Sequence, residues 1–132
     1  MDPISDMLIR IKNAQAVKAD QVLIPFSKSK FQIAGIFKEK GFLSGVERKK
    51  KKEKKSETEY LLATLKYSDN QGAIHGIKII SRPSRRIYIG AKDIKPVRSG
   101  YGIAVISTPE GIMDSREARK KNLGGELMFE IY

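Results

Sequence analysis

The stretch that most constrains the fold is residues 103–131, where the hydrophobic period changes from that of a strand to that of a helix and back. Residues 103–106 are apolar and mostly β-branched, which predicts a buried strand. Hydroxyls, a proline and a glycine follow at residues 107–111 and predict an exposed turn. We therefore expect Ser107 and Thr108 at the rim of a sheet.

A short helix is predicted directly after this turn. Asp114 is placed to be its N-cap, Glu117 to complete a capping box, and Gly124 to end it in a left-handed conformation. Apolar and polar residues then alternate from Gly125 onwards, which predicts a closing strand. The apolar residues expected to share one face of that strand are Leu127, Phe129 and Ile131.

The earlier part of the chain has the pattern of an α-β-α-β-β unit, with two helices on one face of a three- or four-stranded sheet. The fold class is therefore predicted to be α+β, with a first domain over residues 1–80 and a second, mainly-β domain with a short helix over residues 81–132. The expected elements are a helix to about residue 17, a strand over 22–26, a helix from Ser27 to Gly41, and strands over 42–46, 60–67 and 73–80.

The segment between the two predicted domains contains a proline, two serines and three arginines at residues 81–86. Pro and Ser interrupt the strand pattern, so we expect a hinge there. Arg82, Arg85 and Arg86 are too charged to bury unpaired, and Arg suits bidentate contact with phosphate. Tyr88 follows in a short strand, where a stacking face for a base and a core or interface position are both open.

Charge is the most informative property of the composition. The chain has 26 basic and 15 acidic side chains, a net charge of +11. Seven of the eight residues 48–55 are basic, which predicts a flexible hairpin tip. Such a field attracts polyanions, and charge alone does not choose between RNA, DNA, an anionic membrane surface and acidic proteins. A general polyanion or membrane-surface binder acting through residues 48–55 is therefore the alternative function.

Two further lysines lie where a cation is unfavourable. Lys28 and Lys30 fall in the first turn of the predicted second helix, where the helix dipole disfavours positive charge. A bound phosphate would resolve this conflict, and full solvation would resolve it too.

The groups needed for catalysis or metal binding are absent from the sequence pattern. There is no cysteine, and the single histidine, His75, has no acidic residue at ligand spacing, so we expect no metal or cofactor. Ser107 has no predicted base nearby, and Asp114 and Glu117 are explained by capping. No apolar run approaches the roughly 18 residues of a membrane helix. We expect a soluble cytoplasmic protein that is not an enzyme and has no small-molecule substrate.

Three segments resemble one known family. The string from Gly102 to Glu126 is similar to the C-terminal signature of the bacterial-type small-subunit ribosomal protein eight family. Residues 2–13 resemble that family's opening helix, and residues 81–88 its central segment. The three occur in the family's order, and the chain length fits from end to end.

The resemblance implies a structural protein of the ribosome that helps to organise its assembly. Its partners would be neighbouring small-subunit proteins and a helix with an unstacked internal loop in the central domain of small-subunit rRNA. Lys30 would reach phosphate, and Tyr88 would lie beside the contacts to bases and sugars. Those contacts would be made by Ser107, Thr108, Gly124, Gly125 and Glu126.

Glu126 is the sharpest of these predictions. A carboxylate in an RNA interface should accept a hydrogen bond from a base amino group or a sugar 2′-hydroxyl, or organise the turn. The sequence departs from the family pattern at Pro109 and Glu110, where the family commonly has Ser and Lys. One hydroxyl and one positive charge are therefore missing, and residues 48–55 are candidates to supply the missing attraction.

Overall fold

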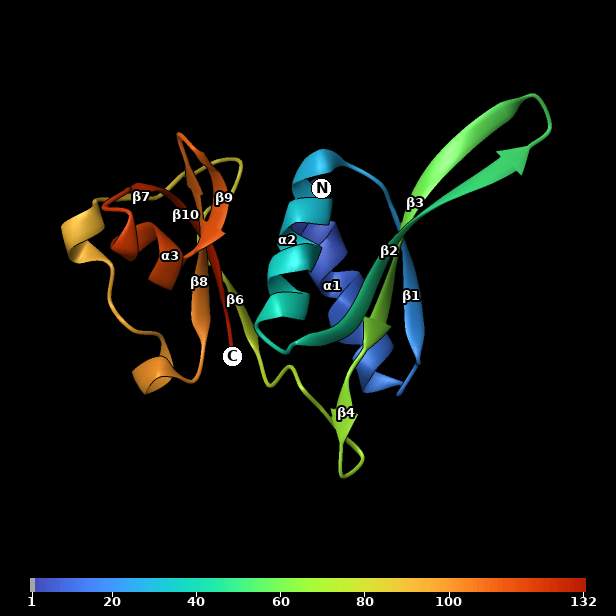
Figure 1. Cartoon of the computed structure of the whole chain (residues 1–132), viewed down its shortest axis with the longest axis horizontal. Coiled ribbons are helices and arrows are strands. Elements are labelled where there is room, and N and C mark those ends of the chain that lie inside the picture. The colour runs from blue at the N-terminus through green and yellow to red at the C-terminus, as the bar shows by residue number, and fades with distance from the viewer. Residues whose placement is uncertain (1) are drawn as a thin grey trace. The chain divides into compact units, whose positions relative to one another are not determined.

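The computed structural model describes residues 2–132, apart from the side chains of Glu53 and Ser99. The chain divides into two compact units, Pro3–Ala73 and Ile74–Tyr132, and each unit combines helix with antiparallel sheet (Figure 1). The predicted α+β class is confirmed.

The first unit is a three-stranded antiparallel sheet in the order β1-β3-β2, with two helices packed on it. Figure 1 shows both helices on one side of this sheet. Its core is formed where the apolar faces meet, for example at Met7, Ile33, Phe37 and Leu61. The elements are α1 (Pro3–Ala16), β1 (Gln21–Pro25), α2 (Lys28–Glu39), β2 (Leu43–Glu53), β3 (Ser56–Leu65) and the small hairpin of β4 (Tyr67–Ser68) and β5 (Gln71–Gly72).

Local signals in the sequence account for the limits of α2. The Ser27 hydroxyl accepts a hydrogen bond from the Lys30 N–H at 3.2 Å, which is the predicted N-cap. Gly41 has φ +86°, a conformation that glycine adopts without steric cost, and it follows the last turn. In the small hairpin the Tyr67 hydroxyl donates to the Ala19 carbonyl at 2.7 Å, and burial, with the Asp20 carboxylate, raises the pKa of Tyr67.

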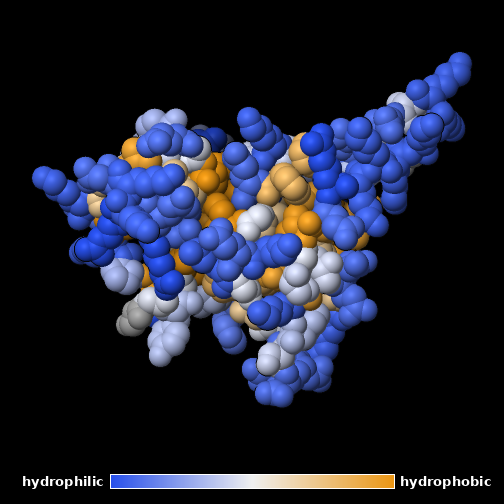
Figure 2. All heavy atoms as spheres, in the orientation of Figure 1, coloured by the Kyte–Doolittle hydropathy of each residue, from blue (hydrophilic) through white to orange (hydrophobic). Residues whose placement is uncertain are grey.

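Residues 48–55, predicted as a hairpin tip, continue both flanking strands as a regular β-ribbon. β2 and β3 stay paired out to Glu53 and Ser56, and the ribbon projects from the sheet with a hydrophilic surface (Figures 1 and 2). The pairing places Lys50 opposite Glu59 and Lys52 opposite Glu57. Pairs of opposite charge on neighbouring strands stabilise strand pairing. The lysines can therefore belong to strands without packing against a hydrophobic core.

The second unit is a sheet organised around its last strand, β10. The antiparallel order is β6-β10-β8-β9, and β7 also pairs with β10. The elements are β6 (Ile77–Ile79), β7 (Tyr88–Ile89), the 3-10 turns η1 (Ala91–Asp93) and η2 (Arg98–Gly100), β8 (Ile103–Thr108), β9 (Gly111–Asp114), α3 (Ser115–Lys120) and β10 (Gly125–Ile131).

Residues 73–86 differ from expectation. The strand expected over 73–80 is reduced to β6 and pairs with β10 rather than with the first sheet. The expected hinge is a tight turn within the second unit, in which Arg82 and Arg85 exchange backbone hydrogen bonds of 3.0 and 2.9 Å. The buried Ser81 hydroxyl lies 2.7 Å from the Leu127 carbonyl and fixes this turn to β10. Both features arise because one edge of β10 pairs with β6 and β7 on either side of the turn.

The turn after residue 106 is also shorter than expected. β8 continues through Ser107 and Thr108, and a strand that the sequence did not indicate, β9, follows Pro109 and Glu110. The predicted cap of α3 is confirmed, because Asp114 Oδ1 accepts from the N–H groups of Arg116 and Glu117 at 2.9 and 3.1 Å. The left-handed residue after α3 is Asn122, with φ 58°, and not Gly124.

A register shift in β10 changes which residues share a face. Leu127 pairs with Ile106 and Phe129 with Val105, so the shift between them puts their side chains on opposite faces. Leu127 packs with Ile106 in the core beneath α3. The prediction that Leu127, Phe129 and Ile131 share a face is therefore wrong for Leu127, because simple alternation does not allow for an extra residue.

Candidate nucleic-acid interface

Four residues form one row across the second sheet. Glu126 of β10 lies opposite Tyr88 of β7 on one side and opposite Ser107 of β8 on the other, and Ser107 in turn lies opposite Ile112 of β9. Directly paired residues of neighbouring strands project from the same face. The sheet therefore brings together three predicted contacts that are far apart in the sequence.

Glu126 is the centre of this row. Its Oε2 accepts from an Arg86 guanidinium nitrogen at 3.1 Å, and its side chain is 19% exposed. A carboxylate has acceptor capacity for several hydrogen bonds, so the arginine orients it without saturating it. Beside it Tyr88 is 72% exposed, which makes Tyr88 a surface group and not a core residue.

The two hydroxyls at the end of β8 have different environments. The Thr108 hydroxyl donates to the Gly111 carbonyl at 2.7 Å and accepts from the Glu110 N–H at 3.2 Å, and Thr108 is only 8% exposed. Thr108 thus shapes the turn between β8 and β9. The half-buried Ser107 hydroxyl makes no hydrogen bond to another residue in the described part of the chain, and it remains available to a ligand.

Gly125, the first residue of β10, and Gly124 just before it make the row possible. A Cβ on Gly125 would lie 2.1 Å from the Ser107 carbonyl oxygen, and one on Gly124 would lie 2.5 Å from the Ile89 carbonyl oxygen. No side chain fits at such distances from backbone atoms. The glycines therefore let β10 enter between β7 and β8, which sets the spacing of Tyr88, Glu126 and Ser107.

The predicted arginines lie together on the turn that leads into β7. Arg82, Arg85 and Arg86 are all exposed, and Arg86 makes the ion pair with Glu126. Within residues 2–132, the side chains of Arg82 and Arg85 have no hydrogen bond or ion pair. Exposed guanidinium groups without internal partners suit contact with phosphate.

The two lysines of α2 also differ. Lys28 is exposed, whereas Lys30 is 7% exposed and its amino group donates to the Pro25 carbonyl at 3.3 Å. The Lys30 amine is already engaged in the first unit, and Lys28 is the more accessible cation of that turn.

The sequence did not indicate the pairing of Arg86 with Glu126 or the place of Ile112 in the row. Both depend on strand pairing between distant segments, for which there is no local signal. The role of Thr108 in its turn could have been predicted from the sequence. In a turn, a Ser or Thr hydroxyl commonly accepts a hydrogen bond from the backbone N–H two residues later.

The described residues offer few features for metal binding or for crossing a membrane. The described residues contain no cluster of three or more His, Cys, Asp or Glu side chains that could hold a metal. The part of the chain that the structure describes also has no helix that is both long and apolar enough to cross a membrane. An exposed aromatic ring, an oriented carboxylate, a hydroxyl and neighbouring arginines are typical of a nucleic-acid-binding protein.

Comparison with known proteins is specific about the family. The family model described as Ribosomal protein S8 matches residues 2–132. The small ribosomal subunit protein uS8 of Mycoplasmopsis pulmonis is 48% identical over 131 residues, which cover 99% of this chain and 96% of that protein. The uS8 protein of Persephonella marina is 43% identical over 134 residues, covering 99% and 98%.

The chain therefore belongs to the ribosomal protein S8 family. This confirms the resemblance found in the motifs, and it agrees with the prediction that the protein is not an enzyme.

Proposed function

We propose that this structural constituent of the small subunit of cytoplasmic ribosomes binds the central domain of small-subunit rRNA directly and helps to organise its assembly. The second unit makes the specific contacts, with a helix that contains an unstacked internal loop. Neighbouring small-subunit proteins are its other partners.

The observation that carries this proposal is the row of Tyr88, Glu126 and Ser107 on one face of three adjacent strands. An exposed ring can stack on an unpaired base. The carboxylate and the hydroxyl beside it can accept from a base amino group or a 2′-hydroxyl. A regular duplex stacks its bases internally, so an irregular loop fits this row better.

The arginines and the row have separate roles in the proposal. Arg82 and Arg85 hold phosphates and position the RNA, a contact that carries no sequence information. Glu126 discriminates between the correct RNA and other RNAs. A buried or half-buried acceptor loses its hydration on binding and must find a hydrogen-bond donor in the correct RNA. Arg86 orients that carboxylate in the absence of RNA.

The test is a gel-shift titration of the full chain with a central-domain rRNA fragment and with a random duplex, at two salt concentrations. We expect Glu126→Ala to weaken binding to the fragment by about 1–3 kcal/mol, as for removal of one good polar interaction. Binding to the random duplex should hardly change. Glu126→Gln, which keeps one acceptor oxygen, should weaken binding less.

Glu130→Ala is the matched control, because Glu130 lies on the same strand but faces the α3 side with Ala104 and Leu127. It should leave affinity for the fragment within about 0.5 kcal/mol of wild type. Equal losses of affinity in the two variants, or no loss in either, would refute the assignment of Glu126.

A further inference from the structure

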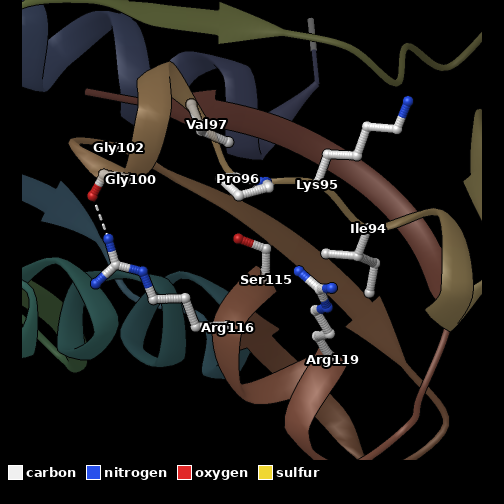
Figure 3. Close-up of a pocket in the computed structure, with 9 residues that line it drawn as sticks. All are labelled: Ile94, Lys95, Pro96, Val97, Gly100, Gly102, Ser115, Arg116 and Arg119. Atoms are coloured by element: carbon white, nitrogen blue, oxygen red, sulfur yellow. Dashed lines mark hydrogen bonds between the residues drawn. The ribbon is translucent and has the colours of Figure 1, made fainter.

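The second unit has a cavity on the α3 side of its sheet. Its volume is about 310 Å³, at the lower end of the range for small-molecule sites. It lies between α3 and the loop over residues 94–102 (Figure 3). Its lining consists of Ile94, Lys95, Pro96, Val97, Gly100, Gly102, Ser115, Arg116 and Arg119, three of them cationic and none acidic.

The walls of this cavity are fixed by hydrogen bonds that involve no ligand. The Arg116 guanidinium donates to the Gly100 carbonyl and ties α3 to η2 (Figure 3). The buried Ser115 hydroxyl accepts from the Ala104 N–H at 3.1 Å and ties α3 to β8. The hollow is therefore preformed, which lowers the entropic cost of binding.

Two of the cations are not engaged in holding the walls. Lys95 and Arg119 are exposed, and neither makes an ion pair or a side-chain hydrogen bond within residues 2–132. Figure 3 shows Arg119 extending from α3 towards Ile94, whereas the side chain of Lys95 extends from the loop away from Arg119. The guanidinium of Arg119 thus lies beside an apolar surface of Ile94, Pro96 and Val97.

This cavity is separate from the row of Tyr88, Glu126 and Ser107. Ile106 and Leu127 face the core beneath α3, and their chain neighbours Ser107 and Glu126 project from the opposite face of the sheet. A ligand in the cavity would therefore not touch the row.

The lining suits a ligand with a flat, largely apolar body and an anionic group. A nucleotide has both, since its base can lie against Pro96 and Val97 while its phosphate reaches the guanidinium of Arg119. An acidic peptide would satisfy the cations, but Asp and Glu side chains have no apolar body to fill the hollow. The lining therefore favours a nucleotide.

We propose that the cavity binds an unstacked nucleotide of RNA, as a second contact on the face of the sheet opposite Glu126. The choice of RNA as the source of this nucleotide rests on the function proposed above. The existence of the cavity and its charges does not depend on the row.

The test is an amide NMR titration of the full chain with uridine monophosphate, adenosine monophosphate, inorganic phosphate and hexaglutamate. Either nucleotide should shift the signals of Val97, Gly102 and Arg119. Arg119→Gln should weaken this binding by roughly tenfold, as for removal of a charged hydrogen bond. Lys120→Gln, also on α3 but outside the lining, should leave it unchanged.

No shift with either nucleotide would overturn the proposal. So would shifts of equal size with inorganic phosphate, which would indicate an anion site without recognition of the base, or with hexaglutamate, which would indicate an acidic protein partner. Glu126→Ala should leave the cavity shifts intact, so failure of the rRNA contact at the row and failure of the cavity contact are distinguishable.

Discussion

At the scale of single residues, the candidate interface depends on which polar groups already have partners. Thr108 and Ser107 are adjacent hydroxyls at the end of β8, yet only Thr108 is bonded within its own turn. Lys30 is likewise bonded within the first unit, whereas Lys28 is exposed. Resemblance alone treats such neighbours as equivalent, while the hydrogen bonds separate those that shape the surface from those that face a ligand.

Thr108→Val tests this separation. The change removes the hydroxyl that bonds the Gly111 carbonyl and the Glu110 N–H, so we expect the free energy of unfolding to fall by about 1 kcal/mol. Thr108→Ser keeps the hydroxyl and should recover most of this decrease, and Ser107→Ala should cost little stability. Urea denaturation measures all three. Unchanged stability in Thr108→Val would mean that the hydroxyl does not organise the turn.

At the scale of elements, β10 determines the second unit, because β6, β7 and β8 all pair with it. Its first residues pass so close to β7 and β8 that only glycine fits. Its register shift then turns Leu127 towards α3 and leaves Phe129 on the other face. The same strand thus positions Glu126 and forms part of the core.

Gly125→Ala should lower the free energy of unfolding by about 2–4 kcal/mol, because the new Cβ would lie against the Ser107 carbonyl. Thermal or urea unfolding measures the decrease. Gly35→Ala is the control: in α2 its Cβ would meet nothing within 4 Å, and removing a helical glycine should stabilise by about 0.5–1 kcal/mol. A Gly125→Ala protein as stable as wild type would contradict the close approach of β10 and β8.

Elements whose limits depend on nearby residues could be predicted from the sequence, whereas elements that depend on pairing between distant strands could not. The caps at Ser27 and Asp114 follow from side chains a few residues away from the groups that they bond. In contrast, β9, the pairing of β6 with β10, and the shift before Phe129 depend on partners elsewhere in the chain. Of the candidate interface, the residues were predicted through the resemblance, but the ion pair of Arg86 with Glu126 required the folded sheet.

At the scale of the whole molecule, the net charge of +11 and the row are expected to act differently. Charge attracts any polyanion over a Debye length, about 8 Å at physiological salt. The row selects the correct RNA by base stacking and hydrogen bonds, which form only when the RNA groups lie in direct contact with it. The ordered ribbon of β2 and β3 presents much of the charge, with Lys49, Lys50, Lys51 and Lys52 all exposed.

Replacing these four lysines by glutamine should weaken binding to every RNA and make the salt dependence shallower. On a duplex, the slope should fall by up to about 0.9 for each phosphate that the lysines no longer neutralise. The ratio of affinities for the central-domain fragment and a random duplex should stay nearly constant. Gel-shift titrations over a salt series measure both quantities. Loss of binding to every RNA would favour the alternative of a general polyanion binder acting through the ribbon.

The most direct measurement is ultraviolet crosslinking of the full chain to the central-domain rRNA fragment, with the crosslinked peptides identified by mass spectrometry. The exposed ring of Tyr88 lies at one end of the row, so the account predicts crosslinks at Tyr88 that Glu126→Ala weakens and excess random duplex does not remove. Crosslinks confined to residues 48–60, with none at Tyr88, would contradict it.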